Sequence, residues 1–228
     1  MAFFKQLFDP ATWTYTYILG DTNKNEAVII DSVLEQVERD LAILNTNGLK
    51  LVGILETHVH ADHITGAGKL REATGAKTYV SEEGGAPCAD NLIRDGVKIS
   101  FGDQVIEVIA TPGHTAGCVS YLWQDRIFTG DALLIDGCGR TDFQSGNPAQ
   151  LYHSITDKIL SLPDETLVYP GHDYKQRYVS SVAEQKQTNP RLANKTEAEF
   201  IEIMNGLNLP HPKRIAEAVP ANQQCGRV

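Results

Sequence analysis

The sequence predicts an α/β fold, in which strands and helices alternate along the chain. Short apolar runs bounded by polar or glycine-containing turns alternate with longer runs whose apolar residues recur every three or four positions. The chain has 228 residues, of which 42% are hydrophobic, and this is enough to bury one substantial core. Because no repeat or low-complexity linker interrupts the pattern, we expect residues 1–228 to form a single domain.

The first half of the chain begins with two runs typical of paired strands, joined by a polar turn. Asp31 and Ser32 are expected to cap a helix that has Val33, Val37, Leu41 and Leu44 on one face and that Gly48 ends. A buried strand, a short helix and another strand should follow. The expected strands are residues 14–19, 26–30, 51–55 and 77–80, and the short helix is residues 66–74.

The second half predicts three successive strands of another sheet and then helices. An amphipathic pattern indicates a helix at residues 148–160, in which His153 is an ordinary helix residue. Thr196 and Glu199 form a capping-box signature before the apolar residues Phe200, Ile201 and Met204. His211 lies in a Pro-His-Pro stretch and is expected in a surface loop. The expected strands are residues 105–109, 119–123 and 126–128.

Charge and hydropathy exclude several classes of partner. The net charge is -9 and no run is rich in Lys or Arg, which argues against a nucleic-acid interface. No stretch approaches the roughly 18 apolar residues of a membrane span. Residues 1–10 resemble neither a secretion signal nor a transit peptide, so we expect a cytoplasmic protein.

The four cysteines, Cys88, Cys118, Cys138 and Cys225, are widely spaced and form no C-x-x-C pair. In a chain of this length this spacing is not a disulfide framework, and we expect a reducing compartment. Free cysteines are usually small buried hydrophobic residues. Cys118 and Cys138 lie near the candidate site described below and are the ones that could take part in its chemistry.

The most informative segment is an H-x-H-x-D-H cluster at residues 58–63, directly after an apolar strand. Three imidazoles and a carboxylate this close together suit a metal far better than a core, because histidine is the commonest protein metal ligand. In an extended segment residues i and i+2 face the same side. We therefore expect His58 and His60 to point into one pocket, with Asp62 and His63 at its rim.

Three more segments place a His or Asp directly after a strand and beside Gly or Pro. They contain His114 after the run 104–110, Asp131 after 126–128, and His172 after 166–168. Any one of them could be an ordinary polar turn. Because loops at strand ends are where rigid folds usually present catalytic groups, four such turns with the same ligand chemistry predict one convergent metal site.

These motifs resemble the metallo-β-lactamase superfamily, in its glyoxalase II branch and more narrowly the persulfide dioxygenases. The superfamily motifs are T-H-x-H-x-D-H at residues 57–63, T-P-G-H-T at 111–115, G-D at 130–131 and P-G-H at 170–172. The resemblance implies a four-layer αββα sandwich and a homodimer. The narrower resemblance rests on residues 57–66, 111–118, 130–135, 137–144, 171–174, 203–210 and 219–222.

Ligand counting alone leaves the metal open. The seven ligand-type residues would satisfy a dinuclear zinc or iron hydrolase, with Asp131 bridging the two ions. The resemblance instead implies one Fe(II) per chain on His58, His114 and Asp131, since two His and one carboxylate form the facial triad of non-heme iron oxygenases. The residues that then orient ligands or water are His60, Asp62, His63 and His172.

The same resemblance implies oxidation of glutathione persulfide by O₂ to sulfite and glutathione. Arg140, Tyr174 and Lys175, beside the metal turns, are the candidates to hold the substrate, because Arg can bind a carboxylate bidentately. Arg140 could equally be a structural ion-pair partner of Asp142.

Two alternatives remain. A dinuclear hydroxyacylglutathione hydrolase of the glyoxalase II type is the first. It is disfavoured because Cys118 stands where that family commonly has His, and because only about 55 residues follow His172, too few for a large extra domain. A metal or persulfide carrier without turnover is the second. It is disfavoured by the open coordination that the ligand set implies, since closed structural sites saturate their metal.

Overall fold

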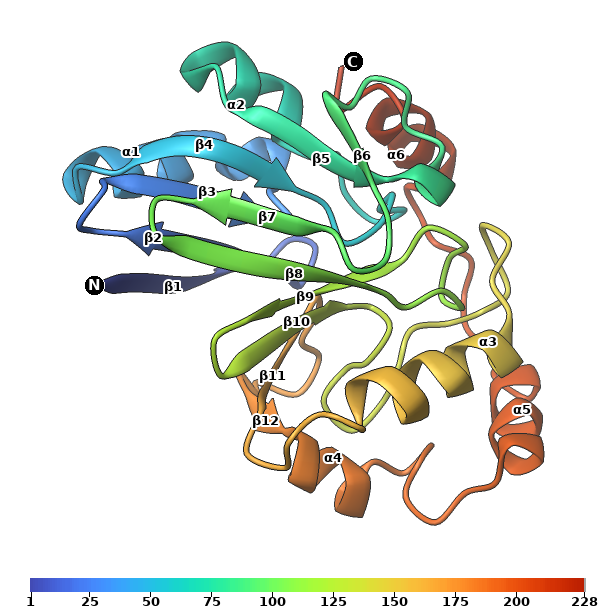
Figure 1. Cartoon of the computed structure of the whole chain (residues 1–228). Coiled ribbons are helices and arrows are strands. Elements are labelled where there is room, and N and C mark those ends of the chain that lie inside the picture. Colours follow the sequence, from blue (N-terminus) through green and yellow to red (C-terminus); the bar gives the residue numbers. More distant parts are fainter. Residues whose placement is uncertain (228) are drawn as a thin grey trace.

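The computed structural model describes residues 1–227 as a sandwich of two six-stranded sheets (Figure 1). In the first sheet β3 to β6 run parallel to one another, and β1 and β2 extend it antiparallel. Its strands, in spatial order, are β1 (Ala2–Asp9), β2 (Thr14–Asp21), β3 (Glu26–Ile30), β4 (Lys50–Leu55), β5 (Lys77–Ser81) and β6 (Asn91–Ile93).

The second sheet is mostly antiparallel, with one parallel pair, β10 and β11. Because β9 runs antiparallel to both of its neighbours, β8, β10 and β11 all point the same way, and their carboxyl ends meet at one edge. The strands, in order, are β7 (Lys98–Phe101), β8 (Gln104–Ala110), β9 (Val119–Trp123), β10 (Arg126–Gly130), β11 (Leu167–Pro170) and β12 (Ser180–Ser181).

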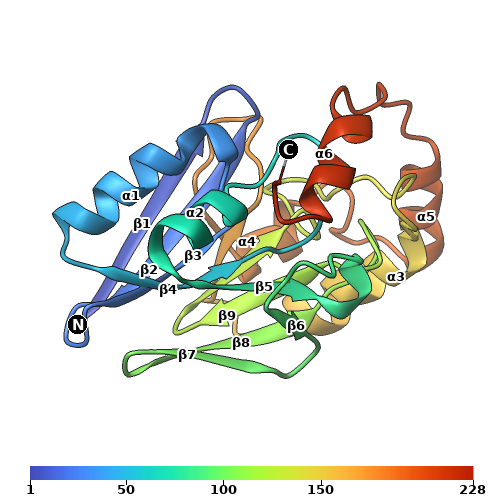
Figure 2. The ribbon, with the colours of Figure 1, turned by 90° about the horizontal axis from the view of Figure 1, so that it is seen from above.

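Helices cover the outer face of each sheet, which gives the four-layer αββα order (Figures 1 and 2). The helices α1 (Val37–Thr46) and α2 (Ala67–Thr74) lie on the first sheet, with α6 (Ile215–Asn222) beside them at one end. The second sheet carries α3 (Pro148–His153), α4 (Val182–Thr188) and α5 (Glu197–Asn205). No helix within residues 1–227 is long and apolar enough to cross a membrane.

Apolar side chains fill all three spaces between the layers. The largest cluster lies between the sheets, where Tyr17 and Ile30 of the first sheet face Tyr121 and Trp123 of the second. Each outer space has its own cluster, one beneath α1 and α2 and the other beneath α3, α4 and α5. Burying both faces of each sheet explains the nearly continuous apolar runs of the central strands.

The predicted elements are present, and the chain contains several more that the sequence did not suggest. The strands β6 and β12 have only three and two residues, too short for a periodic pattern to form. The strand β1 is partly exposed along much of its length and is defined by pairing with β2. Helix α6 contains Pro220, which argues against a helix in a sequence-based reading. The strand β7 and helix α4 were also missed.

Two local expectations were wrong in detail. Asp31 does not cap a helix, because its carboxylate accepts hydrogen bonds from the backbone N–H and the hydroxyl of Thr57 at 2.7 and 2.8 Å. A short 3₁₀ turn, Leu34–Gln36, precedes α1 instead. The expected helix at residues 148–160 begins as α3 and continues as a π-helix over Ser154–Ile159.

The expectation of four free cysteines was also wrong. Cys88 and Cys225 form a disulfide between residues 137 positions apart, while Cys118 and Cys138 are free and buried. Spacing along the chain could not reveal this pair, because it is the packing of α6 beside the β5–β6 connection that brings the two residues together. The bond also stands against the reducing compartment that the cysteine pattern predicted.

Candidate metal centre

The four ligand-bearing turns meet at one edge of the sandwich. His58 follows β4 of the first sheet, whereas His114, Asp131 and His172 follow β8, β10 and β11 of the second. Since those three strands of the second sheet point the same way, their following loops emerge together and face the loop after β4. The predicted convergence of these segments is therefore what the fold produces.

His58, His114 and Asp131 form a group of ligand-type side chains that line one cavity. One ligand atom from each lies within 4.8 Å of the other two. The Nε2 atom of His114 is 3.7 Å from Oδ2 of Asp131, beyond hydrogen-bonding distance, and the rings of His58 and His114 stand nearly perpendicular. The three potential metal-ligand atoms therefore lie close together, and none of them hydrogen-bonds to another.

Hydrogen bonds to the far ring nitrogens decide which tautomers the two histidines adopt. Nδ1–H of His114 donates to the backbone carbonyl of Arg140 at 2.6 Å. Nδ1 of His58 lies 3.0 Å from the hydroxyl of Thr57, which itself donates to Asp31 and so accepts from the ring. Both histidines consequently present the lone pair of Nε2, and such partners are what fixes metal-binding histidines in proteins.

The charge states also suit a metal. Burial, reinforced by His60 and His114, lowers the pKa of His58 well below its usual value and keeps the ring neutral. Burial raises the pKa of Asp131, but His172 outweighs it, lowers the pKa and holds the carboxyl ionised. Because metal ligands must be deprotonated, the neutral ring of His58 and the carboxylate of Asp131 suit a divalent cation such as Fe(II).

His172 lies between two carboxylates. Its Nδ1 is 2.6 Å from Oδ1 of Asp131 and its Nε2 is 3.0 Å from Oδ2 of Asp62. Burial disfavours charge on this ring, but Asp131 and Asp62 outweigh it and raise the pKa of His172 well above its usual value. With both nitrogens donating, His172 offers no lone pair in this arrangement, and it leaves Oδ2 of Asp131 free for a metal.

His60 lies beside His58, with ring centroids 4.1 Å apart, as the i and i+2 spacing predicted. Unlike His58, it is not among the residues that line the cavity described below. Nε2 of His60 lies 3.2 Å from Asp31 and 3.3 Å from Glu56. Burial opposes its protonation, but these two carboxylates outweigh it and raise the pKa of His60 well above its usual value.

A second group of ligand-type atoms adjoins the first. One atom from each of His60, Asp62 and His63 lies within 4.8 Å of the others. Nδ1 of His63 is 2.9 Å from Oδ2 of Asp62, whereas Nε2 of His63 and Nδ1 of His60 are buried without a hydrogen-bond partner. These free ring nitrogens are the feature of the structure that keeps a two-metal arrangement open.

Glycine at two positions allows the loops to approach so closely. Gly130 has φ +51°, and a Cβ there would lie 2.5 Å from the hydroxyl oxygen of Thr57. Gly113 has φ +135°, and its Cβ would lie 2.3 Å from the backbone nitrogen of Leu151 in α3. Because a side chain at either position would push Asp131 or His114 out of place, the Gly-Asp and Pro-Gly-His motifs have a structural cause.

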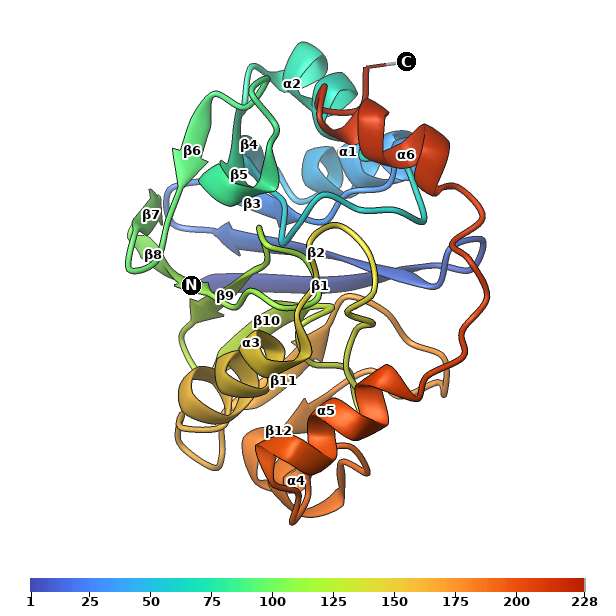
Figure 3. The ribbon, with the colours of Figure 1, turned by 90° about the vertical axis from the view of Figure 1, so that its right-hand side faces the viewer.

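The triad lines a cavity of about 550 Å³, which is large enough for a tripeptide-sized ligand. The expected substrate-binding residues Arg140, Tyr174 and Lys175 all line it. Its other wall includes Leu209, Pro210 and Pro212, from the coil that joins α5 to α6 (Figure 3).

The three candidate substrate-binding residues differ in the contacts that they already make within the protein. Arg140 makes two hydrogen bonds to the Asp142 carboxylate, at 2.6 and 2.7 Å, and one to the carbonyl of Pro210 at 2.8 Å. The ring of Tyr174 is stacked parallel to that of His172 and is 65% exposed. Lys175 is exposed at the rim, with Nζ 3.9 Å from Asp136.

Arg191 also lines the cavity, although no sequence motif indicated that it belongs to the site. It comes from an irregular stretch after α4 and donates to the backbone carbonyl of Cys138 at 2.8 Å. Cys138 lines the cavity too, but burial raises the pKa of its thiol despite the neighbouring Arg191. Burial likewise raises the pKa of Cys118 to about 12, and neither cysteine belongs to a group of ligand-type atoms among the described residues.

Comparisons with known proteins show which family the chain resembles. The family model of the metallo-beta-lactamase superfamily matches residues 14–172. The persulfide dioxygenase ETHE1, mitochondrial, of Homo sapiens is 50% identical over 225 residues, which cover 97% of this chain and 88% of that protein. The crystal structure of ETHE1 from Myxococcus xanthus has a TM-score of 0.97 and 56% identity, covering 99% of this chain and 100% of that one.

The hydrolase branch is more distant. A hydroxyacylglutathione hydrolase of Fuscovulum blasticum is 30% identical over 212 residues, covering 91% of this chain and 81% of that protein. The chain is therefore more similar to proteins named as dioxygenases than to this glyoxalase II relative.

Proposed function

Because the chain belongs to the metallo-beta-lactamase superfamily and, within it, to the persulfide dioxygenase family, we propose that it is an iron-dependent persulfide dioxygenase. Its substrate is glutathione persulfide, which reacts with one O₂ and one water to give glutathione, sulfite and two protons. Fold and family were thus predicted correctly from the motifs, while the metal, its ligands and the glutathione part of the substrate belong to this proposal.

The group formed by His58, His114 and Asp131 carries the proposal. All three residues line the 550 Å³ cavity, so a metal that they held would be accessible from it, and two histidines with one carboxylate would leave coordination positions for substrate and O₂. Bound iron supplies the redox chemistry that activates O₂, while the protein supplies binding and orientation.

The surrounding residues prepare the three ligands. Thr57 and the carbonyl of Arg140 hold the two rings so that Nε2 faces the cavity. His172 bonds to Oδ1 of Asp131 and thereby directs Oδ2 toward the same point. Asp62 is already hydrogen-bonded to His172. We therefore propose that His60, Asp62 and His63 orient the triad rather than bind a second metal. On this proposal one iron binds per chain.

Glutathione carries two carboxylates, and the cavity wall offers cations to receive them. We assign this role to Arg140 and Lys175, with Tyr174 packing against the peptide part of the substrate. The guanidinium of Arg140 is held rigidly by Asp142, which suits a preorganised anion site. Arg191, which also lines the cavity and donates to the carbonyl of Cys138, adds a further positive charge.

The first test loads metal-free protein with Fe(II) under anaerobic conditions and then supplies glutathione persulfide and O₂. Oxygen uptake matched by sulfite in the same vessel is the expected result. No uptake, together with rapid cleavage of S-lactoylglutathione by zinc-loaded protein, would instead establish the dinuclear hydrolase, for which the free nitrogens of His60 and His63 are the supporting observation.

We also propose a cytoplasmic homodimer, in which the Cys88–Cys225 disulfide would be exposed to a reducing environment. The human relative is named as mitochondrial, so cell fractionation with an antibody against the chain decides the location. Light scattering of the purified protein decides the number of chains per particle.

A further inference from the structure

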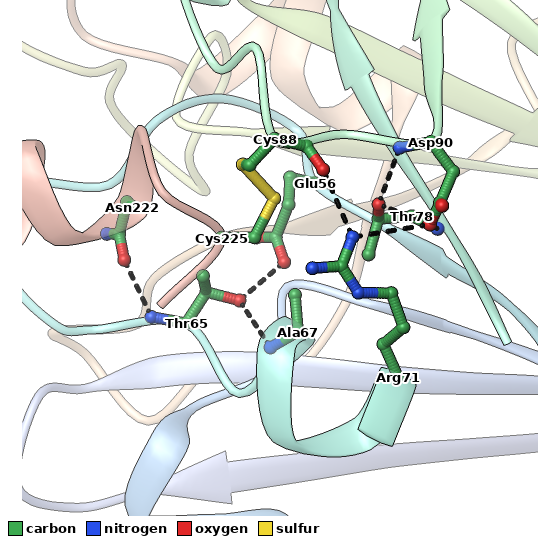
Figure 4. The surroundings of a disulfide bond; sticks show 9 residues. All are labelled: Glu56, Thr65, Ala67, Arg71, Thr78, Cys88, Asp90, Asn222 and Cys225. Atoms are coloured by element: carbon green, nitrogen blue, oxygen red, sulfur yellow. Dashed lines mark hydrogen bonds and ion pairs between the residues drawn. A yellow bond between two sulfur atoms is a disulfide. The ribbon is translucent and has the colours of Figure 1, made fainter. Parts of the chain in front are cut away.

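The C-terminal end of the chain packs on the loop that carries the proposed metal ligands. The side chain of Asn222 is buried, and its Nδ2 donates to the backbone carbonyls of His60 and His63 at 2.9 and 2.8 Å. Its Oδ1 accepts the backbone N–H of Thr65 at 2.9 Å (Figure 4). One side chain thus satisfies three backbone groups of the loop, from more than 150 residues away.

Apolar and backbone contacts extend this attachment. Val219 packs in the cluster that contains Val59, the residue between His58 and His60. Ala218 and Ala221 pack against Ile64. A Cβ on Gly226 would lie 2.1 Å from the carbonyl oxygen of Thr65, so the two backbones are in direct contact. The last turn of the chain is therefore fitted to residues 59–65.

The Cys88–Cys225 disulfide is the covalent part of this attachment. Cys225 follows Asn222 by three residues, and Cys88 lies in the β5–β6 connection, which Arg71 of α2 holds by donating to the carbonyl of Cys88 at 3.0 Å (Figure 4). On its other side α6 is joined to α5 only by the coil of residues 206–214 (Figure 3). Without the bond, that coil would be the only covalent restraint on α6.

We propose that Asn222 is a positioning residue for the metal-binding loop, and that the Cys88–Cys225 disulfide holds Asn222 in place so that reduction of this bond loosens the metal. The inference rests on the metal centre proposed above, but its effect on the loop does not require a metal to be present. Hydrogen bonds from Asn222 restrain the backbone on both sides of Asp62, and through it the segment that begins at His58.

A phosphine is the reductant in the test of this proposal. The disulfide takes up two electrons and two protons and becomes two thiols, while the phosphine and one water become the phosphine oxide. Cys88 is partly exposed and gives the reagent access, whereas Cys225 is buried. Cys118 and Cys138 are already free thiols and do not react with a phosphine.

The first measurement is amide hydrogen exchange of residues 57–66 in metal-free protein, oxidised and reduced. We expect exchange there to rise roughly tenfold on reduction and further in Asn222→Ala, because the restraining hydrogen bonds are weakened or removed. Asn222→Asp keeps an acceptor for Thr65 but loses both donors, and should resemble Asn222→Ala. Equal exchange in oxidised, reduced and Asn222→Ala protein would overturn the proposal.

The second measurement is the rate at which a chelator removes Fe(II) from loaded protein. Reduced wild type and the double variant Cys88→Ser/Cys225→Ser should both lose iron several-fold faster, and the double variant should not respond to the phosphine. Val182→Ala, which truncates a buried residue of α4 in the other outer layer, controls for general destabilisation and should keep iron as wild type does.

The two measurements separate this proposal from the proposed function. Should no variant bind iron, the proposed function fails, while the exchange comparison still decides the role of Asn222. If Asn222→Ala does not fold, oxidised and reduced wild type still provide the comparison. The proposal that reduction loosens the metal would be contradicted if iron were lost at the same rate before and after reduction. Thiol counting must first show that the disulfide is open.

Discussion

At the scale of single residues, hydrogen bonds decide which ring nitrogens at the candidate site keep a free lone pair. The sequence places all seven ligand-type side chains at the site but cannot tell them apart. In the structure, the hydrogen-bond partners of each histidine ring distinguish these residues. His58 and His114 have a free Nε2, both nitrogens of His172 face carboxylates, and His60 has only Nδ1 free. These partners come from distant segments, so no local motif contains the information.

The triad makes a first prediction. His58→Ala or His114→Ala should weaken iron binding at least roughly 100-fold and abolish oxygen uptake, because each removes a ligand that no neighbour replaces. Iron per chain after gel filtration is the measurement. His153→Ala is the matched control, since His153 is exposed and bonds only to surface carboxylates. Normal iron content in either triad variant would contradict the assignment.

Arg140 makes a second prediction. Arg140→Ala should raise the KM for glutathione persulfide roughly 10-fold or more and leave kcat within a few-fold, since a charged hydrogen bond to the substrate is lost and the metal ligands remain. Arg126→Ala is the control, because Arg126 also pairs with a neighbouring Asp but lies outside the cavity lining. An unchanged KM would show that Arg140 serves only its ion pair with Asp142.

At the scale of elements, strong patterns were predicted and short or context-dependent ones were missed. The central strands and α1, α2 and α5 have long apolar runs or clear caps, such as the capping box of Thr196 and Glu199. Strands β6 and β12 are too short to show a period, and α6 has Pro220 inside. One of the elements that were not predicted is α6, which packs on residues 59–65. Its role depends on tertiary contacts, which the sequence does not reveal.

Helix α1 makes a third prediction, about pH. Burial raises the pKa of Asp40 from 3.8 to about 6, although Arg39 opposes the shift. A carboxyl with a raised pKa binds its proton more tightly in the folded state, so stability falls as pH rises from about 4 to 6. The free energy of unfolding of wild type minus that of Asp40→Asn should therefore fall by about 2 to 3 kcal/mol between pH 4 and 7.

Urea unfolding of both proteins at several pH values measures this difference. Asp157→Asn, which changes an exposed helical carboxylate, is a control in which the pH dependence should stay close to that of wild type. A difference between wild type and Asp40→Asn that stays constant across this range would show that Asp40 is not protonated in the folded protein.

At the scale of the whole molecule, the site joins the two halves of the sandwich. His58 comes from the first sheet, and His114 and Asp131 come from the second. Hydrogen bonds between the halves support the same edge, since Tyr17 donates to the carbonyl of Pro170 and Tyr15 to Asp173. A metal bound by these three residues would therefore link both sheets, as the disulfide links α6 to the first half.

The disulfide makes a fourth prediction. Because it closes a loop between residues 137 positions apart, the variant Cys88→Ser/Cys225→Ser should lower the free energy of unfolding by about 3 to 5 kcal/mol. Urea titrations with and without a phosphine measure it, and reduced wild type should match the variant. Equal stability of oxidised wild type and the variant would mean that the bond adds nothing to the fold.

The central claim is that one iron on His58, His114 and Asp131 makes this chain a persulfide dioxygenase. Titrating Fe(II) into metal-free protein while recording oxygen uptake and sulfite with glutathione persulfide tests it most directly. The account predicts activity that rises linearly and saturates at one iron per chain, with one sulfite for each O₂. Saturation at two irons, or full iron loading without oxygen uptake, would contradict it.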